Sequence, residues 1–342
     1  MKERDSNIEL LRIFATISII ILHCNGWFLI EWGGGVTDWK TGGWAVATSR
    51  SLIQSVTLLG VDVFILISGF YGIRPKLKSI VNLFTLLLFF YVVCYIWNCY
   101  LGKEMFSIIG LIKHMLAFSW SNWFINSYLF LMLLSPVINK YVNNSQTKKL
   151  AIYILCYCVL TLYMGCIRKN EYWWYNGGYS ITMMLGVYLV GQYLSRVVDD
   201  LGCIRYWHLI VAFICMIVIM SILRVFLPQG GVLLQYGSPI VIVAAVLLFL
   251  LFYHMPKFKS KFVNWIASSC LASFILHTCN PVFSWLINKD ITYFSQETFP
   301  IYCLKIGGVI LGVFALSILL DKIRLLIFSP LIKWIGKIKQ LN

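Results

Sequence analysis

The apolar stretch at residues 8–30 constrains the fold of this chain more than any other feature. It is long enough to cross a bilayer, because a transmembrane helix needs roughly 20 apolar residues, yet it contains Arg12 and His23. At about 100° per residue these positions are three turns plus about 20° apart, so both side chains project from one face, ~16 Å apart along the axis. This pattern indicates a polar track through the membrane. The alternative is two unrelated polar residues, with Arg12 snorkelling to the interface.

The composition of the whole chain is that of a membrane protein. Of the 342 residues, 60% are hydrophobic and 12% are charged, whereas soluble domains contain about 25% charged residues. We predict an all-α, polytopic helix bundle that forms a single integral-membrane domain over residues 1–342. Ten transmembrane spans are expected, at residues 8–30, 51–72, 80–101, 122–139, 150–168, 179–195, 207–226, 237–254, 262–286 and 301–320. Residues 104–121, which contain Lys113 and His114, favour an interfacial or re-entrant helix.

The formal charge of +15 follows from topology rather than from a nucleic-acid partner. If the N-terminus is cytoplasmic, roughly two thirds of the 28 lysines and arginines fall on the cytoplasmic side of the predicted spans, as the positive-inside rule describes. We therefore expect both termini to be cytoplasmic, in a cell membrane of the bacterial inner-membrane type. The remaining role of this charge is contact with anionic lipid headgroups of the bilayer.

The eleven cysteines are scattered through apolar stretches, without a CxxC pair or a Cys/His spacing that suits zinc. Neither a metal site nor a disulfide framework is predicted. The short charged N-terminus precedes a span too long for a signal-peptide core, so we expect it to stay attached.

Ionisable residues inside predicted spans are the candidates for chemistry, because each costs at least ~2.5 kcal/mol at the centre of a span unless it is paired or hydrated. Besides Arg12 and His23, these are Asp62 and His277. The predicted spans place both histidines ~22 Å from the cytoplasmic face, and they place Asp62 at a depth between those of Arg12 and His23. The four could line one cavity. Each also has a structural reading: the histidines as helix-packing residues, Asp62 as an acid that pairs with Arg12.

Four segments of the sequence resemble the integral-membrane acyltransferase 3 family. They are the Arg12–His23 pattern in the first span, GVDVFILISGF at 60–70, WFINSYLFLMLLSP at 123–136 and SFILHTCNPV at 273–282. The resemblance implies transfer of an acyl group, usually acetyl, from cytoplasmic acyl-CoA to a hydroxyl of a surface or exported glycan. The family's basic motif after SGF carries two arginines. Here Arg74 matches, and the second role falls to Lys76 or Lys78, which lack the bidentate fork of arginine.

The chemistry of acyl transfer agrees with these residues. Transfer from a thioester to a hydroxyl needs a base, a donor for the oxyanion and a cationic site for the phosphates of the coenzyme. An imidazole with an unperturbed pKa near 6.5 suits the base, so His23 is the first candidate, with Asp62 as an orienting acid and His277 as a further catalytic candidate. The residues assigned to the phosphates are Arg12, Arg74, Lys76 and Lys78. Acetyl-CoA would be a substrate, and no permanently bound cofactor is expected.

Two other functions use the same features. A transporter or flippase of a lipid-linked saccharide or small solute would use the polar face of residues 8–30 as its path. A relative that kept the fold as a sensor is the weaker reading, because both Arg12 and His23 are present. The acyl chain, the acceptor sugar, direct transfer or an acyl-histidine intermediate, and homo-oligomer formation all stay open.

Overall fold

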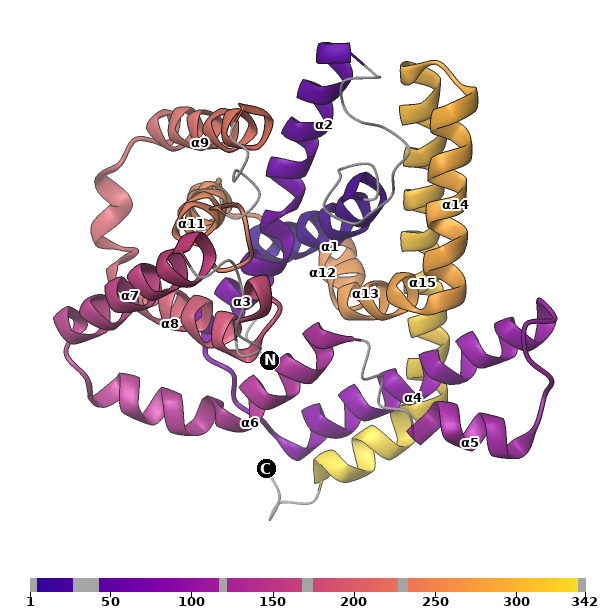
Figure 1. The fold of residues 1–342 in the computed structure, drawn as a ribbon. Coiled ribbons are helices and arrows are strands. Elements are labelled where there is room, and N and C mark those ends of the chain that lie inside the picture. The colour runs from indigo at the N-terminus through magenta and orange to yellow at the C-terminus, as the bar shows by residue number, and fades with distance from the viewer. Residues whose placement is uncertain (1–4, 27–42, 117–121, 168–174, 227–232, 338–342) are drawn as a thin grey trace. The chain divides into compact units, whose positions relative to one another are not determined.

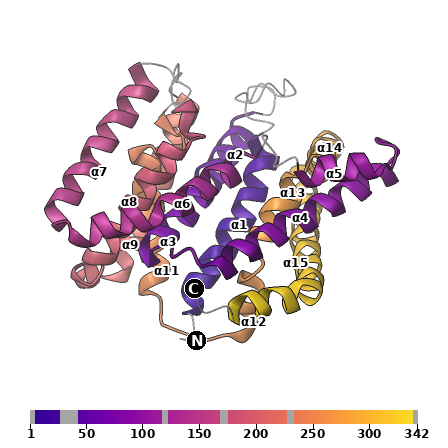
Figure 2. The same ribbon diagram turned by 90° about the horizontal axis from the view of Figure 1, so that it is seen from below.

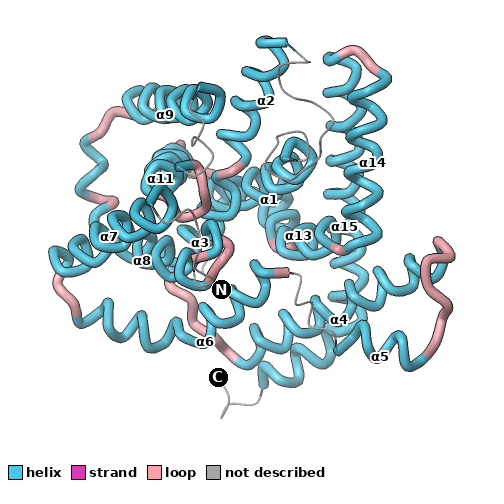
Figure 3. Tube along the Cα trace, viewed as in Figure 1, coloured by secondary structure: helices cyan, strands magenta, loops and turns pink. Residues whose placement is uncertain are grey.

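The computed structural model describes residues 5–26, 43–116, 122–167, 175–226 and 233–337. Within these ranges all regular secondary structure is helical (Figure 3). The predicted all-α fold is therefore confirmed for the described part of the chain. Residues 27–30 of the first predicted span and residues 117–121 of the predicted interfacial segment lie outside it.

The helices fall into two compact units. Unit 1 comprises Met1–Arg74 and Trp123–Asn264, and unit 2 comprises Pro75–Asn122 and Trp265–Asn342. Unit 1 holds α1 (Ser6–Gly26), α2 (Gly43–Thr57), α3 (Leu59–Tyr71), α6 (Trp123–Asn144), α7 (Thr147–Leu162), α8 (Ile181–Val197), α9 (Tyr206–Phe226) and α11 (Pro239–His254). Unit 2 holds α4 (Leu77–Tyr100), α5 (Ile108–Leu116), α13 (Cys270–Thr278), α14 (Asn280–Gln296) and α15 (Phe299–Lys337). The boundary falls within α12 (Lys261–Ala267). The single domain over residues 1–342 stays a prediction.

Several helices are long and apolar enough to cross a membrane. Among the described residues, six segments qualify by length and composition: Ser6–Asn25, Thr48–Tyr71, Leu77–Tyr100, Thr147–Gly165, Tyr206–Phe226 and Phe299–Gly336. A seventh arises if the bent pair Lys261–Thr278 and Asn280–Gln296 counts as one broken span, and Pro239–His254 is a shorter apolar helix. The chain is thus a multi-pass membrane protein, and the number of ten spans stays a prediction.

The segment predicted as a span at residues 262–286 is not one straight helix. The helix that ends at Thr278 and the helix that begins at Asn280 are bent by 77° relative to each other. Cys279 between them has extended backbone angles, and Pro281 occupies the first turn of α14. In an unbroken helix the ring of Pro281 would clash with the carbonyl of His277, four residues earlier, and could not donate a hydrogen bond to it, which explains the break.

The predicted span at residues 301–320 is only part of a longer helix. α15 has 39 residues and continues to Lys337. At 1.5 Å per residue it is about 58 Å long, well beyond the ~30 Å hydrocarbon thickness of a bilayer. The charged residues that would end a hydropathy-based span, Asp321 and Arg324, instead pair with each other inside the helix. α5 is the short helix expected within residues 104–121.

Helix α3 forms the core of unit 1. It packs against α1, α8 and α11 (Figures 1 and 2), and most of its apolar side chains are buried, including Leu59, Val63, Ile65 and Leu66. Close contact with α8 depends on two glycines. A Cβ atom on Gly69 would lie 2.3 Å from the carbonyl oxygen of Tyr188, and one on Gly191 would lie 2.4 Å from that of Leu66. Gly69 in the SGF segment thus permits the backbones of α3 and α8 to pack directly against each other.

Candidate functional site

Arg12 and His23 lie on one unbroken helix. α1 runs from Ser6 to Gly26 without interruption, so the angular relationship predicted for two residues eleven positions apart applies to it. Both side chains are partly buried. The structure therefore places both residues on one continuous helix, and the polar track between them stays a prediction.

Arg12 is paired rather than isolated. Its Nη1 donates to Oε1 of Glu9 at 3.0 Å and to Oε2 at 3.3 Å. The Arg12 side chain is 26% exposed and that of Glu9 only 4%. Glu9 was not predicted as part of the site, although its position three residues before Arg12 is the helical spacing at which opposite charges meet. The pair neutralises Arg12 locally while leaving part of the guanidinium accessible.

The first turn of α1 is fixed by Asn7, which is buried. Its Nδ2 donates to the carbonyl oxygens of Phe252, Met255 and Pro256 at 3.0–3.3 Å, and its Oδ1 accepts from the backbone N–H of Phe258 at 3.2 Å. These carbonyls lie at the C-terminal end of α11, where helical carbonyls lack partners within the helix. Asn7 thereby holds the Glu9–Arg12 end of α1 against the end of α11.

A buried polar cluster lies two residues beyond His23. Asn25 donates through Nδ2 to Oε1 of Gln54 at 2.8 Å and to the carbonyl of Arg50 at 3.1 Å. The guanidinium of Arg50, which is only 4% exposed, donates to Oδ1 of Asn25 at 3.4 Å. Arg50 was not predicted as a candidate residue, because it directly precedes a predicted span and its position is typical of an interfacial charge.

Asp62 is fully buried in the first turn of α3. Its Oδ1 accepts from the backbone N–H of Gly237 at 3.0 Å, and its Oδ2 makes no hydrogen bond with the described residues. Gly237 has a φ of +70°, which favours glycine, and its carbonyl accepts from the hydroxyl of Tyr157 at 3.3 Å. The carboxylate thus holds the turn before α11, and its hydrogen bond does not go to His23.

The basic segment after α3 presents its cations outward. Arg74, Lys76 and Lys78 are all exposed. No ion pair or side-chain hydrogen bond joins any of the three to another residue in the described ranges. Arg74 belongs to unit 1, and the two lysines belong to unit 2.

His277 lies in the last turn of α13, in unit 2, and is fully buried. Its Nδ1 is 2.7 Å from the carbonyl oxygen of Ser273, and the ring of Phe274 meets it edge-on with centroids 5.6 Å apart. The bend at Cys279 begins two residues later. His277 and His23 belong to different units, so their predicted common depth stays a prediction.

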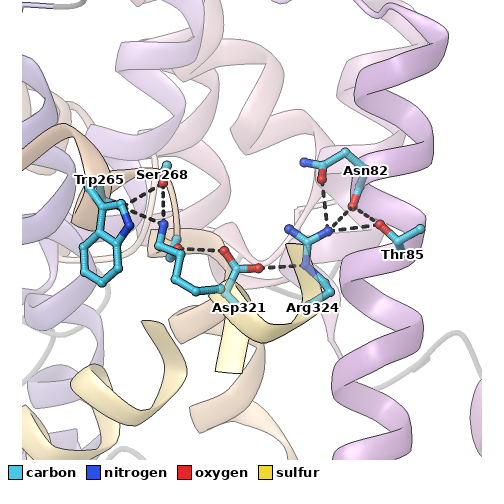
Figure 4. Close-up of polar contacts among 8 residues, drawn as sticks. Asn82, Thr85, Trp265, Ser268, Asp321 and Arg324 are labelled. Atoms are coloured by element: carbon cyan, nitrogen blue, oxygen red, sulfur yellow. Dashed lines mark hydrogen bonds and ion pairs between the residues drawn. The ribbon is translucent and has the colours of Figure 1, made fainter. Parts of the chain in front are cut away.

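A buried network holds the start of α13 (Figure 4). Arg324 donates through Nε to Oδ1 of Asp321 at 2.7 Å and through Nη1 to Oδ1 of Asn82 and Oγ1 of Thr85, each at 3.0 Å. Oδ2 of Asp321 accepts from the hydroxyl of Ser269 at 2.7 Å. α15 is thereby tied both to α4 and to the connection between α12 and α13.

Lys322 adds a second contact at this connection. Its Nζ donates to Oγ of Ser268 at 2.9 Å and lies 4.6 Å from the ring centroid of Trp265 (Figure 4). Neither this contact nor the Asp321–Arg324 network was predicted, because both depend on residues far apart in the sequence.

The structure thus places Arg12, His23, Asp62 and Arg74 in unit 1 and His277, Lys76 and Lys78 in unit 2. Among the described residues, no group of three or more His, Cys, Asp or Glu side chains is placed to hold a metal ion.

Comparison with known proteins identifies the family. Neither the curated proteins nor the solved structures contain a match to this chain. The family described as Acyltransferase domain, acyltransferase 3, matches residues 5–318, nearly the whole chain. The chain therefore belongs to the acyltransferase 3 family and is a membrane acyltransferase.

Proposed function

We propose that this protein is a membrane O-acyltransferase that moves an acyl group, acetyl in the first instance, from cytoplasmic acyl-CoA to a hydroxyl of a cell-surface or exported polysaccharide or its lipid-linked precursor. The observation that carries the proposal is α1, where Arg12 and His23 lie on one unbroken helix in a chain of an acyltransferase family. A cation toward one end and an imidazole toward the other suit a donor held by its phosphates with its thioester farther along the helix.

In this proposal His23 is the general base. Its imidazole takes the proton of the acceptor hydroxyl as the hydroxyl oxygen attacks the thioester carbonyl, and a new ester C–O bond forms. The C–S bond then breaks, and the sulfur of the coenzyme receives the proton from the imidazolium and leaves as a thiol. No acyl-enzyme is required for this sequence.

The phosphates of the donor are assigned to the basic residues at the cytoplasmic end of the protein. Arg12 keeps part of its guanidinium accessible beside Glu9, and Arg74 is exposed and forms no ion pair with an acidic residue in the described ranges. Lys76 and Lys78 follow directly in the sequence and add charge without a fixed fork. Asp62 and His277 are retained as candidates near the reacting groups.

The proposed topology has ten spans with both termini cytoplasmic, in a bacterial inner membrane. Hydrogen bonds between the ends of three helices support it. The carbonyl of Ile73, just after α3, accepts a hydrogen bond from Asn139 near the end of α6. Oδ1 of Asn139 in turn accepts from Gln192 near the end of α8. Alternating spans would bring these three ends to the same face. The basic residues next to them are Arg74, Lys140 and Arg196, as expected of a cytoplasmic face.

The test is acyl transfer by detergent-purified protein from radiolabelled acetyl-CoA to a glycan acceptor. The wild-type protein should transfer label, and His23→Ala should lose transfer while eluting as a folded, monodisperse protein. His208→Ala is the matched control, because His208 is an exposed histidine near the start of α9. Full transfer by His23→Ala would remove His23 from the proposed role.

A second arm separates the enzyme from a transporter. A flippase would not turn over acetyl-CoA in detergent, and its transport in vesicles would persist without the coenzyme. That pair of results would contradict the proposed function as a whole.

A further inference from the structure

The backbone that leads into Arg74 is gripped by two side chains from other helices. Gly72 turns the chain out of α3 with a φ of +69°. At the next residue, the N–H of Ile73 donates to the hydroxyl oxygen of Tyr188 at 2.9 Å, and its carbonyl accepts from Nδ2 of Asn139 at 2.8 Å. Both backbone polar groups of Ile73 are thus held by side chains of α8 and α6.

The gripping side chains also bind one another. The hydroxyl of Tyr188 donates to Oδ1 of Asn139 at 2.7 Å. Nε2 of Gln192 donates to the same Oδ1 at 3.0 Å and to the hydroxyl oxygen of Tyr188 at 3.2 Å. Tyr188 and Gln192 are buried. We call Asn139, Tyr188 and Gln192 the loop clamp. A satisfied buried network of this kind is rigid, because each member fixes the orientation of the others.

The surrounding helices hold the loop clamp in place. Tyr188, Gln192 and Arg196 are spaced four residues apart on α8 and therefore share one face. Arg196 donates to the carbonyls of Ser145 and Val142 at the end of α6, the helix that carries Asn139. Where α8 contacts α3, Gly69 and Gly191 permit the close approach of the two backbones described above.

We infer that the loop clamp positions Arg74 for the phosphates of the acyl donor. The inference rests on the proposed function. Arg74 directly follows Ile73, its side chain is exposed, and no ion pair or side-chain hydrogen bond to the described residues orients it. The loop clamp therefore acts on Arg74 through the backbone, by fixing the point from which its side chain extends.

The position of Arg74 is important for phosphate binding, because the basic residues that follow it are lysines. Where the family carries a second arginine, this chain has Lys76 or Lys78. A lysine binds phosphate as a point charge, whereas an arginine binds it through two parallel donors in a fixed plane. Within residues 74–78, Arg74 is thus the only side chain that can recognise phosphate directionally. Loosening the backbone before it should weaken donor binding without altering the reacting groups.

The primary variant is Tyr188→Phe, which removes the acceptor of the Ile73 N–H and keeps the ring that fills the core. We expect the KM for acetyl-CoA to rise about tenfold while kcat and the KM for the glycan stay within about twofold. The matched control is Tyr141→Phe on α6, because the Tyr141 hydroxyl donates to the exposed hydroxyl of Tyr153 at 2.9 Å rather than to the loop before Arg74. Asn139→Ala is the second variant and should give the same pattern.

A double mutant separates positioning from a general structural role. In an Arg74→Ala background, Tyr188→Phe should raise the KM for acetyl-CoA no further, because two changes that act through one group are not additive. An equal rise in both backgrounds would overturn the inference. So would a fall in kcat with an unchanged KM.

Hydrogen exchange distinguishes failure of the inference from failure of the proposed function. Faster exchange in the peptide that contains Ile73 is expected for Tyr188→Phe and not for Tyr141→Phe, whatever the donor is. If the loop loosens and the wild-type protein uses acetyl-CoA but the KM does not change, the inference alone is wrong. If the wild-type protein neither binds nor uses acetyl-CoA, the proposed function fails, and the inference fails with it.

Discussion

Asp321 and Arg324 form an ion pair of 2.7 Å between side chains one turn apart on α15, and both are buried, at 1% and 3% side-chain exposure. Nη1 of Arg324 also bonds to α4, and Oδ2 of Asp321 accepts from Ser269 at the start of α13. A buried pair is retained without loss of stability only when such further bonds are made. This network is therefore a joint between three segments of unit 2.

Asp321→Ala should destabilise the protein by about 3–5 kcal/mol, because it leaves the Arg324 guanidinium buried without its carboxylate. Thermal unfolding in detergent, followed by tryptophan fluorescence, measures the effect. The exposed pair of Lys305 and Glu297 in the same unit provides the control. Lys305→Ala should cost about 0–1 kcal/mol. Equal losses at the two pairs would show that burial does not determine the strength of this joint.

Gly69→Ala should destabilise the protein, because its Cβ would meet the backbone of α8 rather than a movable side chain. Overpacking of this kind costs about 1–3 kcal/mol or more. The matched substitution is Gly312→Ala within α15, where no atom lies within 4 Å of the new Cβ. There the change should stabilise by about 0.5–1 kcal/mol, as alanine is the better helix former. A neutral Gly69→Ala would mean that α3 and α8 can separate without cost.

Arg12→Ala should have two separable effects. The variant loses the guanidinium partner of the nearly buried Glu9, so its melting temperature should fall. Adding Glu9→Gln removes the buried charge and should restore part of that stability. In both variants the KM for acetyl-CoA should stay raised, if Arg12 contacts the donor phosphates. Recovery of a normal KM together with stability would assign Arg12 a purely structural role.

Asp62→Asn should preserve the fold, because the amide oxygen still accepts from the N–H of Gly237. Asp62→Leu removes this acceptor and leaves a buried N–H without a partner, which costs about 1–3 kcal/mol. The difference in melting temperature between the two variants checks this. Since the carboxylate bonds to Gly237, transfer should fall less in Asp62→Asn than in His23→Ala. An equal loss would assign Asp62 a direct role in the reaction.

The sequence was sufficient for features that depend on local pattern. The helical fold, the continuous helix with Arg12 and His23 on one face, and the short helix within residues 104–121 follow from hydropathy and helical periodicity. The break at Cys279 also had a local signal, namely Pro281, which the length of the apolar run outweighed in the prediction. The continuation of α15 past residue 320 was not predicted, because a hydropathy scale counts Asp321 and Arg324 as two separate charges. In the structure they neutralise each other within the helix.

Contacts between distant segments were not predictable in this way. Asn139 and Tyr188 bind the backbone of Ile73, and Asn7 binds the backbone around Phe252 to Phe258. A backbone N–H or carbonyl is the same in every residue, so the sequence does not mark it as a partner. Asp62 illustrates the consequence: its residue type predicted a histidine partner, and the fold supplied a peptide N–H.

The bend at Cys279 also changes where helix dipoles end. A helix carries a partial negative charge at its C-terminus and a partial positive charge at its N-terminus. Because α13 ends at Thr278 and α14 begins at Asn280, opposite poles of two helices meet across one residue. His277 therefore lies close to both partial charges. In an unbroken helix over residues 262–286, these partial charges would lie at the two distant ends of the helix.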